Sequence, residues 1–277
     1  MADILIIDDK PIFDNSIVKI ETHTYNPYAN TTFGYSDEIR IPIQQQDLYT
    51  LPCDSFLYIE GKIKIKKLDD KLTAALGNNC VAFMFDAIRY ELNGVEIDRN
   101  RNVGITSTFK NYISLTSDNA VMLQNAGWRD SKLEPEIELH KIQWRMSHVI
   151  LNEVNKLSML RTLDSGRYLS MTFRSWDLYE YPLLQSTTKH SWAVKAATQL
   201  EKPRYVIFAL QTDRKNVMSK NQPFLMINES IKSATVDVRL EFDCKENVPA
   251  NTTAYCLILH DRIVEYSPLS NVVRKVL

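Results

Sequence analysis

The chain has few glycines, seven in 277 residues, and they stand apart from one another. Backbone cradles for nucleotide phosphates need closely spaced glycines, as in G-x-G-x-x-G or Walker-type loops, and no such loop is present. A serine nucleophile in a G-x-S-x-G turn is absent as well. The sequence therefore predicts neither a dinucleotide-binding enzyme nor a serine hydrolase of that kind.

An excess of one charge is also missing, because 33 Lys and Arg residues balance 34 Asp and Glu residues. Without a basic field, the chain is not expected to read nucleic acid directly. No apolar run approaches the length of a membrane span, and Ile4–Ile7 lacks the basic leader of a signal peptide. The four cysteines are far apart with no C-x-x-C pair, which favours free thiols in a reducing compartment. We expect no membrane span and an intracellular rather than secreted protein.

The most informative stretch that is present is Val81–Asp98, VAFMFDAIRYELNGVEID. It predicts two strands joined at Asn93-Gly94, because a type I′ turn needs positive φ at both central residues. After the turn, Val95 and Ile97 alternate with acidic residues, which indicates one face on a core and one in water. Such a hairpin needs further strands to bury its apolar face.

Other segments carry alternating or β-rich patterns, with a bulge expected at Gly61. A short helical turn is predicted at Leu68–Gly77, and helices at Thr116–Ala126 and Val149–Leu163, the second ended by Gly166. The predicted strands are Ile17–Thr24, Glu38–Ile43, Phe56–Ile65, Val103–Leu115, Ile137–Trp144, Tyr168–Tyr181, Ser191–Thr198, Arg204–Thr212, Ala234–Phe242 and Ala254–Tyr266.

About a dozen short strands with few helices indicate an all-β chain of jelly-roll or Greek-key sandwiches rather than βαβ units. The polar stretch RDSKLEPE at residues 129–136 is the best candidate for a boundary between two domains. We predict a flexible lead-in at residues 1–16, a first jelly roll at 17–130 and a second at 131–277.

Candidate chemical residues are scattered. A cupin-like metal site would need His140, His190 or His260 to converge from distant strands, and His140 and His260 are interpreted as sheet-surface residues. Paired carboxylates would come from Asp177, Glu180 and Glu201. A sugar-stacking platform would need exposed tryptophans, which sandwiches more often use in cores or interfaces. The four tryptophans are Trp128, Trp144, Trp176 and Trp192. We assign no catalytic, cofactor-binding or metal-binding residue and no cofactor.

Long segments nevertheless resemble a known family. They are DEIRIPIQQQDLYTLP, FLYIEGKI, FDAIRYELNGVEIDRNRNVGITST, WDLYEYPLL, TKHSWAVKAATQLEKPRYVIFALQT and ESIKSATVDVRLEF…VPANTTAYCLILHDRIVEY. From about Ile17 onward the chain resembles double jelly-roll domain proteins encoded in invertebrate genomes. These are similar to the hexon-like major capsid proteins of Maverick/Polinton elements and adintovirus-like DNA viruses.

The resemblance implies two jelly rolls side by side and a shell-building protein without catalysis, in which three copies form a capsomer. It also implies further self-assembly, contacts with other capsid proteins, and a place in the virion if the chain is viral. One departure from the family is that Gly127–Glu136 and Val217–Asn228 are short joins where members carry extra strands. The chain is therefore interpreted as an internally shortened member, or a domesticated relative, with exposed sheet edges.

Two other functions remain open from the sequence. One is a jelly-roll module that binds carbohydrate or protein through Trp and Tyr side chains, and the other is the cupin-like metalloenzyme. For the hairpin at Asn93-Gly94, we predict a structural role, with a polar face made of Arg89, Glu91, Glu96 and Asp98 that is available to neighbours.

Overall fold

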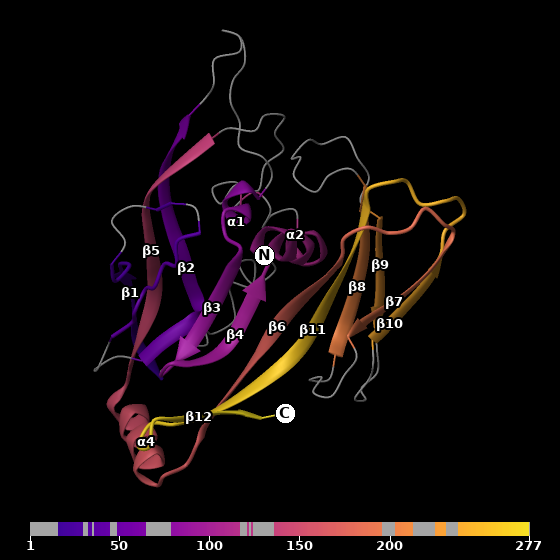
Figure 1. Cartoon of the computed structure of the whole chain (residues 1–277). Coiled ribbons are helices and arrows are strands. Elements are labelled where there is room, and N and C mark those ends of the chain that lie inside the picture. Colours follow the sequence, from indigo (N-terminus) through magenta and orange to yellow (C-terminus); the bar gives the residue numbers. More distant parts are fainter. Residues whose placement is uncertain are drawn as a thin grey trace, which may run out of the picture. The chain divides into compact units, whose positions relative to one another are not determined.

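The chain is built mainly of antiparallel strands, as the computed structural model in Figure 1 shows. Two compact units are present and are described separately: unit 1 is Met1–Lys66 with Glu136–Arg167, and unit 2 is Lys67–Pro135 with Tyr168–Leu277. The structure describes residues 16–29, 33–34, 36–44, 49–64, 79–116, 121, 123, 136–195, 203–212, 225–230 and 238–276.

Unit 1 contains a three-stranded antiparallel sheet in the order β1–β5–β2 (Figure 1). A shift in register between β2 and β5 follows the pairing of Glu60 with Lys141, since Gly61 pairs with Leu139. This confirms the bulge predicted at Gly61. The strands are β1 (Ile17–Tyr25), β2 (Tyr49–Lys64) and β5 (Glu136–Leu151).

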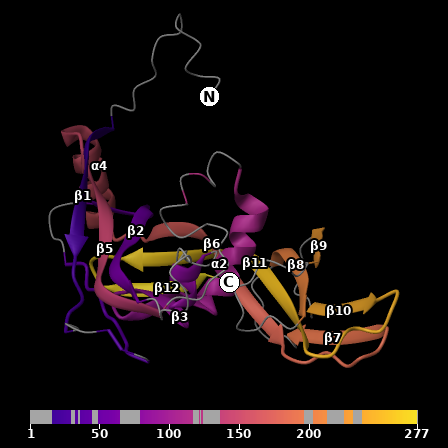
Figure 2. The same cartoon turned by 90° about the horizontal axis from the view of Figure 1, so that it is seen from above.

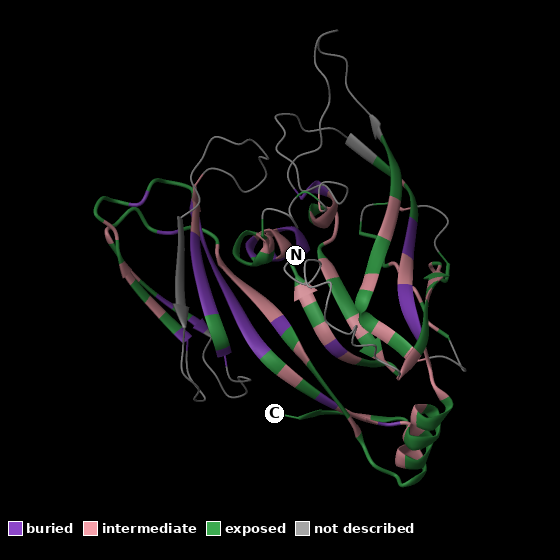
Figure 3. Ribbon diagram, turned by 180° about the vertical axis from the view of Figure 1, so that it is seen from behind, coloured by how far each residue is buried: buried purple, intermediate pink, exposed green. Residues whose placement is uncertain are grey.

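Helix α4 (Glu153–Asp164) follows β5 in unit 1. The Asn152 side chain caps it by accepting a hydrogen bond from the backbone N–H of Asn155 at 2.8 Å. The predicted helix is confirmed, but it begins four residues after Val149 because β5 continues to Leu151. No side chain of α4 is buried, and its coil is green and pink in Figure 3.

Unit 2 is organised around the long strand β11 (Thr252–Ser267). β11 pairs with β6 along one edge, and with β8 and then β12 along the other; β9 extends the sheet beyond β8. All these pairs are antiparallel. The other strands of the sheet are β6 (Leu169–Tyr181), β8 (Pro203–Thr212), β9 (Leu225–Ser230) and β12 (Val272–Val276).

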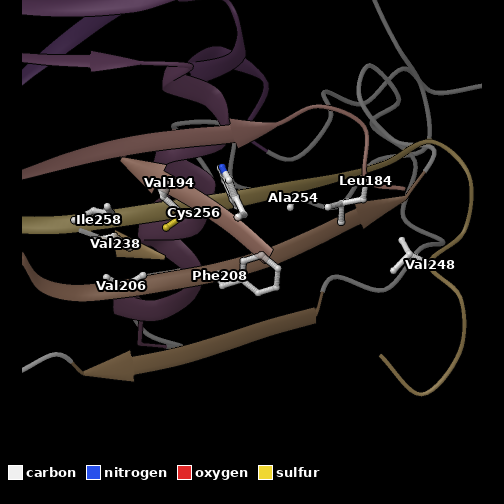
Figure 4. Packing of buried hydrophobic residues seen from close by; sticks show 10 residues of the cluster. Leu184, Val194, Val206, Phe208, Val238, Val248, Ala254, Cys256 and Ile258 are labelled. Atoms are coloured by element: carbon white, nitrogen blue, oxygen red, sulfur yellow. The ribbon is translucent and has the colours of Figure 1, made fainter. Parts of the chain in front are cut away.

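One face of this sheet is covered by a second pair of strands, β7 (Lys189–Lys195) and β10 (Val238–Asp243), which run side by side in Figure 2. Side chains from both layers form the first core cluster, which Figure 4 shows as sticks. Its members are Leu184, Trp192, Val194, Val206, Phe208, Val238, Val248, Ala254, Cys256 and Ile258. Two packed β layers are the sandwich expected from the sequence.

The other face of β8 and β11 is covered by helix α2 (Val103–Ser114), whose Phe109 is 1% exposed. Phe109 meets the Tyr255 ring edge-on, with the ring centroids 6.0 Å apart. The second core cluster consists of Phe109, Ile207, Ala209, Tyr255, Leu257 and Leu259. The prediction of strands at Val103–Leu115 was therefore wrong: residues 103, 106 and 109 repeat at helical spacing and are buried.

The predicted hairpin is present as β3 (Ala87–Leu92) and β4 (Val95–Arg101). Asn93 and Gly94 have φ values of 50° and 77°, as the two-residue turn requires. The segment before β3 was predicted incorrectly, because Cys80–Phe83 forms the short helix α1. α1 packs on α2 through Phe83, which leaves no room for a side chain at position 104.

Other predictions have mixed outcomes. Ile17–Thr24, Tyr168–Tyr181, Arg204–Thr212 and Ala254–Tyr266 are confirmed as strands, and Ile137–Trp144 lies within β5. The strand predicted at Glu38–Ile43 is absent, and these residues lack regular structure. The predicted join Val217–Asn228 contains the beginning of β9. Neither β9 nor β12 was predicted from the sequence.

Several predicted segments lie largely or wholly outside the described residues. They are the lead-in to residue 15, Leu68–Gly77, most of Thr116–Ala126 and most of the boundary at 129–136. The division into a first and a second jelly roll at residues 130 and 131 stays a prediction.

The bulge at Gly61 generates a stability prediction. A Cβ atom added there would lie 2.6 Å from the backbone oxygen of Glu138, so Gly61→Ala must push β2 away from β5. We expect a loss of about 1–3 kcal/mol in the free energy of unfolding of unit 1, measured by chemical denaturation. The exposed neighbour Lys62 is the control, because Lys62→Ala should change stability by less than about 0.5 kcal/mol. Equal stabilities for the two variants would contradict this account of the bulge.

Candidate functional site

The three histidines that a cupin-like metal site would need have different surroundings. His140 in β5 lies 4.0 Å from Glu138, and His190 in β7 stacks on Phe242 with the ring centroids 4.9 Å apart. His260 in β11 is 2% exposed and lies 3.1 Å from Asp177. The interpretation of His260 as a sheet-surface residue was wrong. Within the described part of the chain, no three metal-binding side chains come together.

Two of the tryptophans that a sugar platform would need lie in or against the cores, the location that the sequence favoured. Trp192 is buried in the first cluster and packs on Tyr181, with the ring centroids 5.7 Å apart. Trp176 packs against the second cluster, with the Lys110 ammonium 5.6 Å from its ring centroid. Trp144 lies in β5, half-buried, and Trp128 is outside the described residues.

The two candidate carboxylates that the structure describes, Asp177 and Glu180, lie at different positions along β6. Asp177 lies 3.1 Å from His260 and 3.7 Å from the Arg262 guanidinium, so its neighbours are basic side chains on the adjacent strand β11. Glu180 lies further along β6, where its negative charge and, more strongly, burial raise the pKa of Tyr255. Glu201 is outside the described residues.

A partly buried polar network fastens the hairpin to the main sheet of unit 2. Asp98 of β4 accepts a hydrogen bond from the Ser175 hydroxyl at 2.6 Å and one from Arg262 Nη1 at 2.9 Å. Arg262 Nη1 also reaches the backbone oxygen of Ile97 at 3.5 Å. Asp98 was expected to face neighbouring molecules, and this part of the prediction was wrong, because its carboxylate bonds within the unit.

The network contains a serine, a histidine and carboxylates, but it is built as a structural element. A nucleophilic serine must donate its proton toward a base, usually histidine, and must be reachable by substrate. Ser175 is fully buried and donates to Asp98. What the arrangement does is neutralise charges and satisfy polar groups where the hairpin meets β6 and β11.

Sequence comparison identifies the family. The sequence profile of the double jelly roll-like domain matches residues 74–132, 129–227 and 223–264, more than half of the chain. The chain belongs to the double jelly roll-like domain family. Among curated protein sequences, no match to this chain was found.

Two solved structures are similar to this double jelly roll-like protein in fold. The PBCV-1 virus capsid (quasi-atomic model) has a TM-score of 0.58 at 7% identity, covering 97% of this chain and 99% of that chain. The crystal structure of PBCV-1 VP54, fitted into a reconstruction of the virophage Sputnik, has the same TM-score and coverage at 8% identity. These likenesses support the all-β, double jelly-roll fold. No described helix of the protein is long and apolar enough to cross a membrane.

The Asp98 network of the double jelly roll-like protein generates a second stability prediction. Asp98→Ala removes the acceptor of two hydrogen bonds and leaves Ser175 and Arg262 without it, so we expect a loss of about 1.5–3 kcal/mol or more in unfolding free energy. Asp261, half-exposed in the same sheet, pairs with Arg204 at 2.8 Å and is the control. Asp261→Ala should cost less than about 1 kcal/mol, since exposed ion pairs contribute little. A smaller loss for Asp98→Ala than for the control would contradict the structural role.

The cysteines generate a third prediction. All four are free thiols; Cys53 is exposed, whereas Cys80 and Cys256 are buried, and burial raises the pKa of Cys256 to about 12. The thiolate is the reactive form, so alkylation near pH 8 should modify Cys53 first and Cys256 only after denaturation. Peptide mass spectrometry measures both rates. Rapid native labelling of Cys256 would show that its strand opens readily.

Proposed function

We propose that the protein is a capsid-like structural protein without catalytic activity, which associates into trimeric capsomers. The observation that carries the proposal is membership of the double jelly roll-like domain family, together with the fold it shares with the PBCV-1 capsid structures. Folds host many functions, so the shell-building role is a proposal and the fold is its support. If the chain is viral, its place is the virion.

The exposed apolar side chains of α4 give this proposal a physical basis. Val154 is 75% exposed, Leu157 is 52% exposed and Leu160 is 43% exposed, and their spacing of three places them on one stripe of the helix. Apolar area left in water favours association, because its burial stabilises a complex by roughly 25 cal/mol per Å². In our proposal this stripe takes part in contacts between copies.

The carbohydrate-binding alternative has less support. A stacking platform needs aromatic faces open to solvent. Trp192 lies within the first core cluster and Trp176 packs against the second, so neither presents the open platform that the alternative needs. The relationship to Maverick/Polinton elements is likewise part of the proposal. A packaging ATPase gene beside this gene would support it.

Size measurement tests the proposal directly. Analytical ultracentrifugation over a concentration series should show a trimer that dissociates on dilution. A monomer at every concentration would refute the proposed assembly.

The contribution of α4 is tested with matched variants. Leu157→Ser removes an exposed apolar side chain, so it should shift the association to higher concentration without lowering the unfolding midpoint of the monomer. Thr162→Ser, on the opposite side of the helix, should leave association unchanged. Equal association by both variants would place the contact elsewhere.

A further inference from the structure

Two histidine rings meet between the edge strand β1 and the central strand β5 of unit 1. The ring centroids of His23 and His148 are 4.5 Å apart in an edge-on arrangement. His148 is fully buried, and its Nε2 lies 2.9 Å from the hydroxyl oxygen of Tyr25. Its Nδ1 is buried without a hydrogen-bond partner in the described part of the chain.

Other ionisable groups near the pair come mainly from β1. Glu21 is the register partner of His148 and lies 3.3 Å from His23 Nε2, and it also bonds Lys19. From β2, the register partner of His148 is Thr50. Asp54 of β2 accepts a hydrogen bond from Ser147, whose side chain points to the other face of β5. Among the described groups, Glu21 is therefore the one acidic side chain in contact with the pair, and its carboxylate also pairs with the Lys19 ammonium.

Protonation of His148 is unfavourable in this arrangement. A neutral ring can leave Nδ1 as a bare acceptor, whereas a protonated ring carries an N–H at both nitrogens and would bury one of them unpaired. Burial lowers the pKa of His148, as does the nearby charge of His23, while Glu21 opposes these effects. Two protonated rings at this separation would also repel each other.

We propose that the His23–His148 pair is a pH-sensitive latch, which holds β1 on β5 at neutral pH and releases the strand in mildly acidic solution. Release exposes both rings to water, where each can bind a proton without a buried, unpaired N–H. The latch lies within unit 1 of a single chain, so it goes beyond the proposed assembly and does not depend on it.

The direction of the pH effect follows from the lowered pKa. A released His148 binds a proton below its usual pKa of 6.5, whereas the latched ring does not, so attachment of β1 is strongest above that pH and weakens as pH falls below it. Glu21 acts at lower pH. Its pKa lies below the usual 4.5, mainly because of its bonds to Lys19 and His23, so its contribution is lost only in stronger acid.

Hydrogen exchange of the full-length protein tests the latch. Exchange rates near pH 7.5 and pH 5.5, corrected for the intrinsic pH dependence, are measured by mass spectrometry for peptides from β1 and from β11. The opening of β1 should increase on acidification by up to about tenfold per pH unit for each proton taken up. The β11 peptides should not change, which separates strand release from global unfolding.

Variants assign the effect to the pair. His148→Gln and His23→Gln should each reduce the acid-induced opening of β1, and His140→Gln, on the same strand β5, should retain it. His23 is partly exposed, so His23→Gln keeps the test valid if His148→Gln does not fold. Acid-induced opening that is absent in the wild type, or unchanged in His23→Gln, would overturn the proposal. Because exchange is measured at concentrations where the chain is monomeric, a failed latch and a failed assembly are distinguishable.

Discussion

The structure of unit 2 depends on one constraint, which is that β11 must be buried on both faces. Its residues Thr252–His260 are buried without interruption (Figure 3). Cys256 and Ile258 point to one layer, while Tyr255 and Leu257 point to the other. A strand of this kind is stable only between two covering layers. The β7–β10 pair supplies one layer and α2 supplies the second, so both are required by the same strand.

The polar network begins where this buried run ends. His260 is the last residue of the run, and Arg262 follows two positions later on the same face of β11. Polar and charged groups that lose contact with water need partners, and these come from β6 and from the hairpin through Asp177 and Asp98. The hairpin is thus attached by charge-assisted hydrogen bonds, whereas the layers on either side of β11 are attached by apolar packing.

Local signals explain which elements could be predicted from the sequence. The Asn93-Gly94 turn and the long strand at Ala254–Tyr266 depend on neighbouring residues, and both predictions were right. Residues Val103–Ser114 contain β-branched and aromatic side chains that suit strands, yet they form a helix because Phe109 fills the space over β11. The partly buried network could not be predicted, because the partners of Asp98 are distant in sequence: Ser175 lies 77 positions away and Arg262 lies 164 positions away. The contact between His23 and His148 was missed for the same reason.

The two units also differ in how much apolar packing each contains within itself. Both core clusters lie in unit 2, whereas the described part of unit 1 buries three apolar side chains, Ile142, Met146 and Val149, all on β5. The middle strand of unit 1, β5, is also distant in sequence from its neighbour β2, because β2 ends at Lys64 and β5 begins at Glu136. A sheet with few buried contacts and a long loop to close is the part of a protein that opens first. Unit 1 is therefore the part of the chain where the proposed burial of α4 against another copy, and the proposed acid-sensitive contact between β1 and β5, would change stability most.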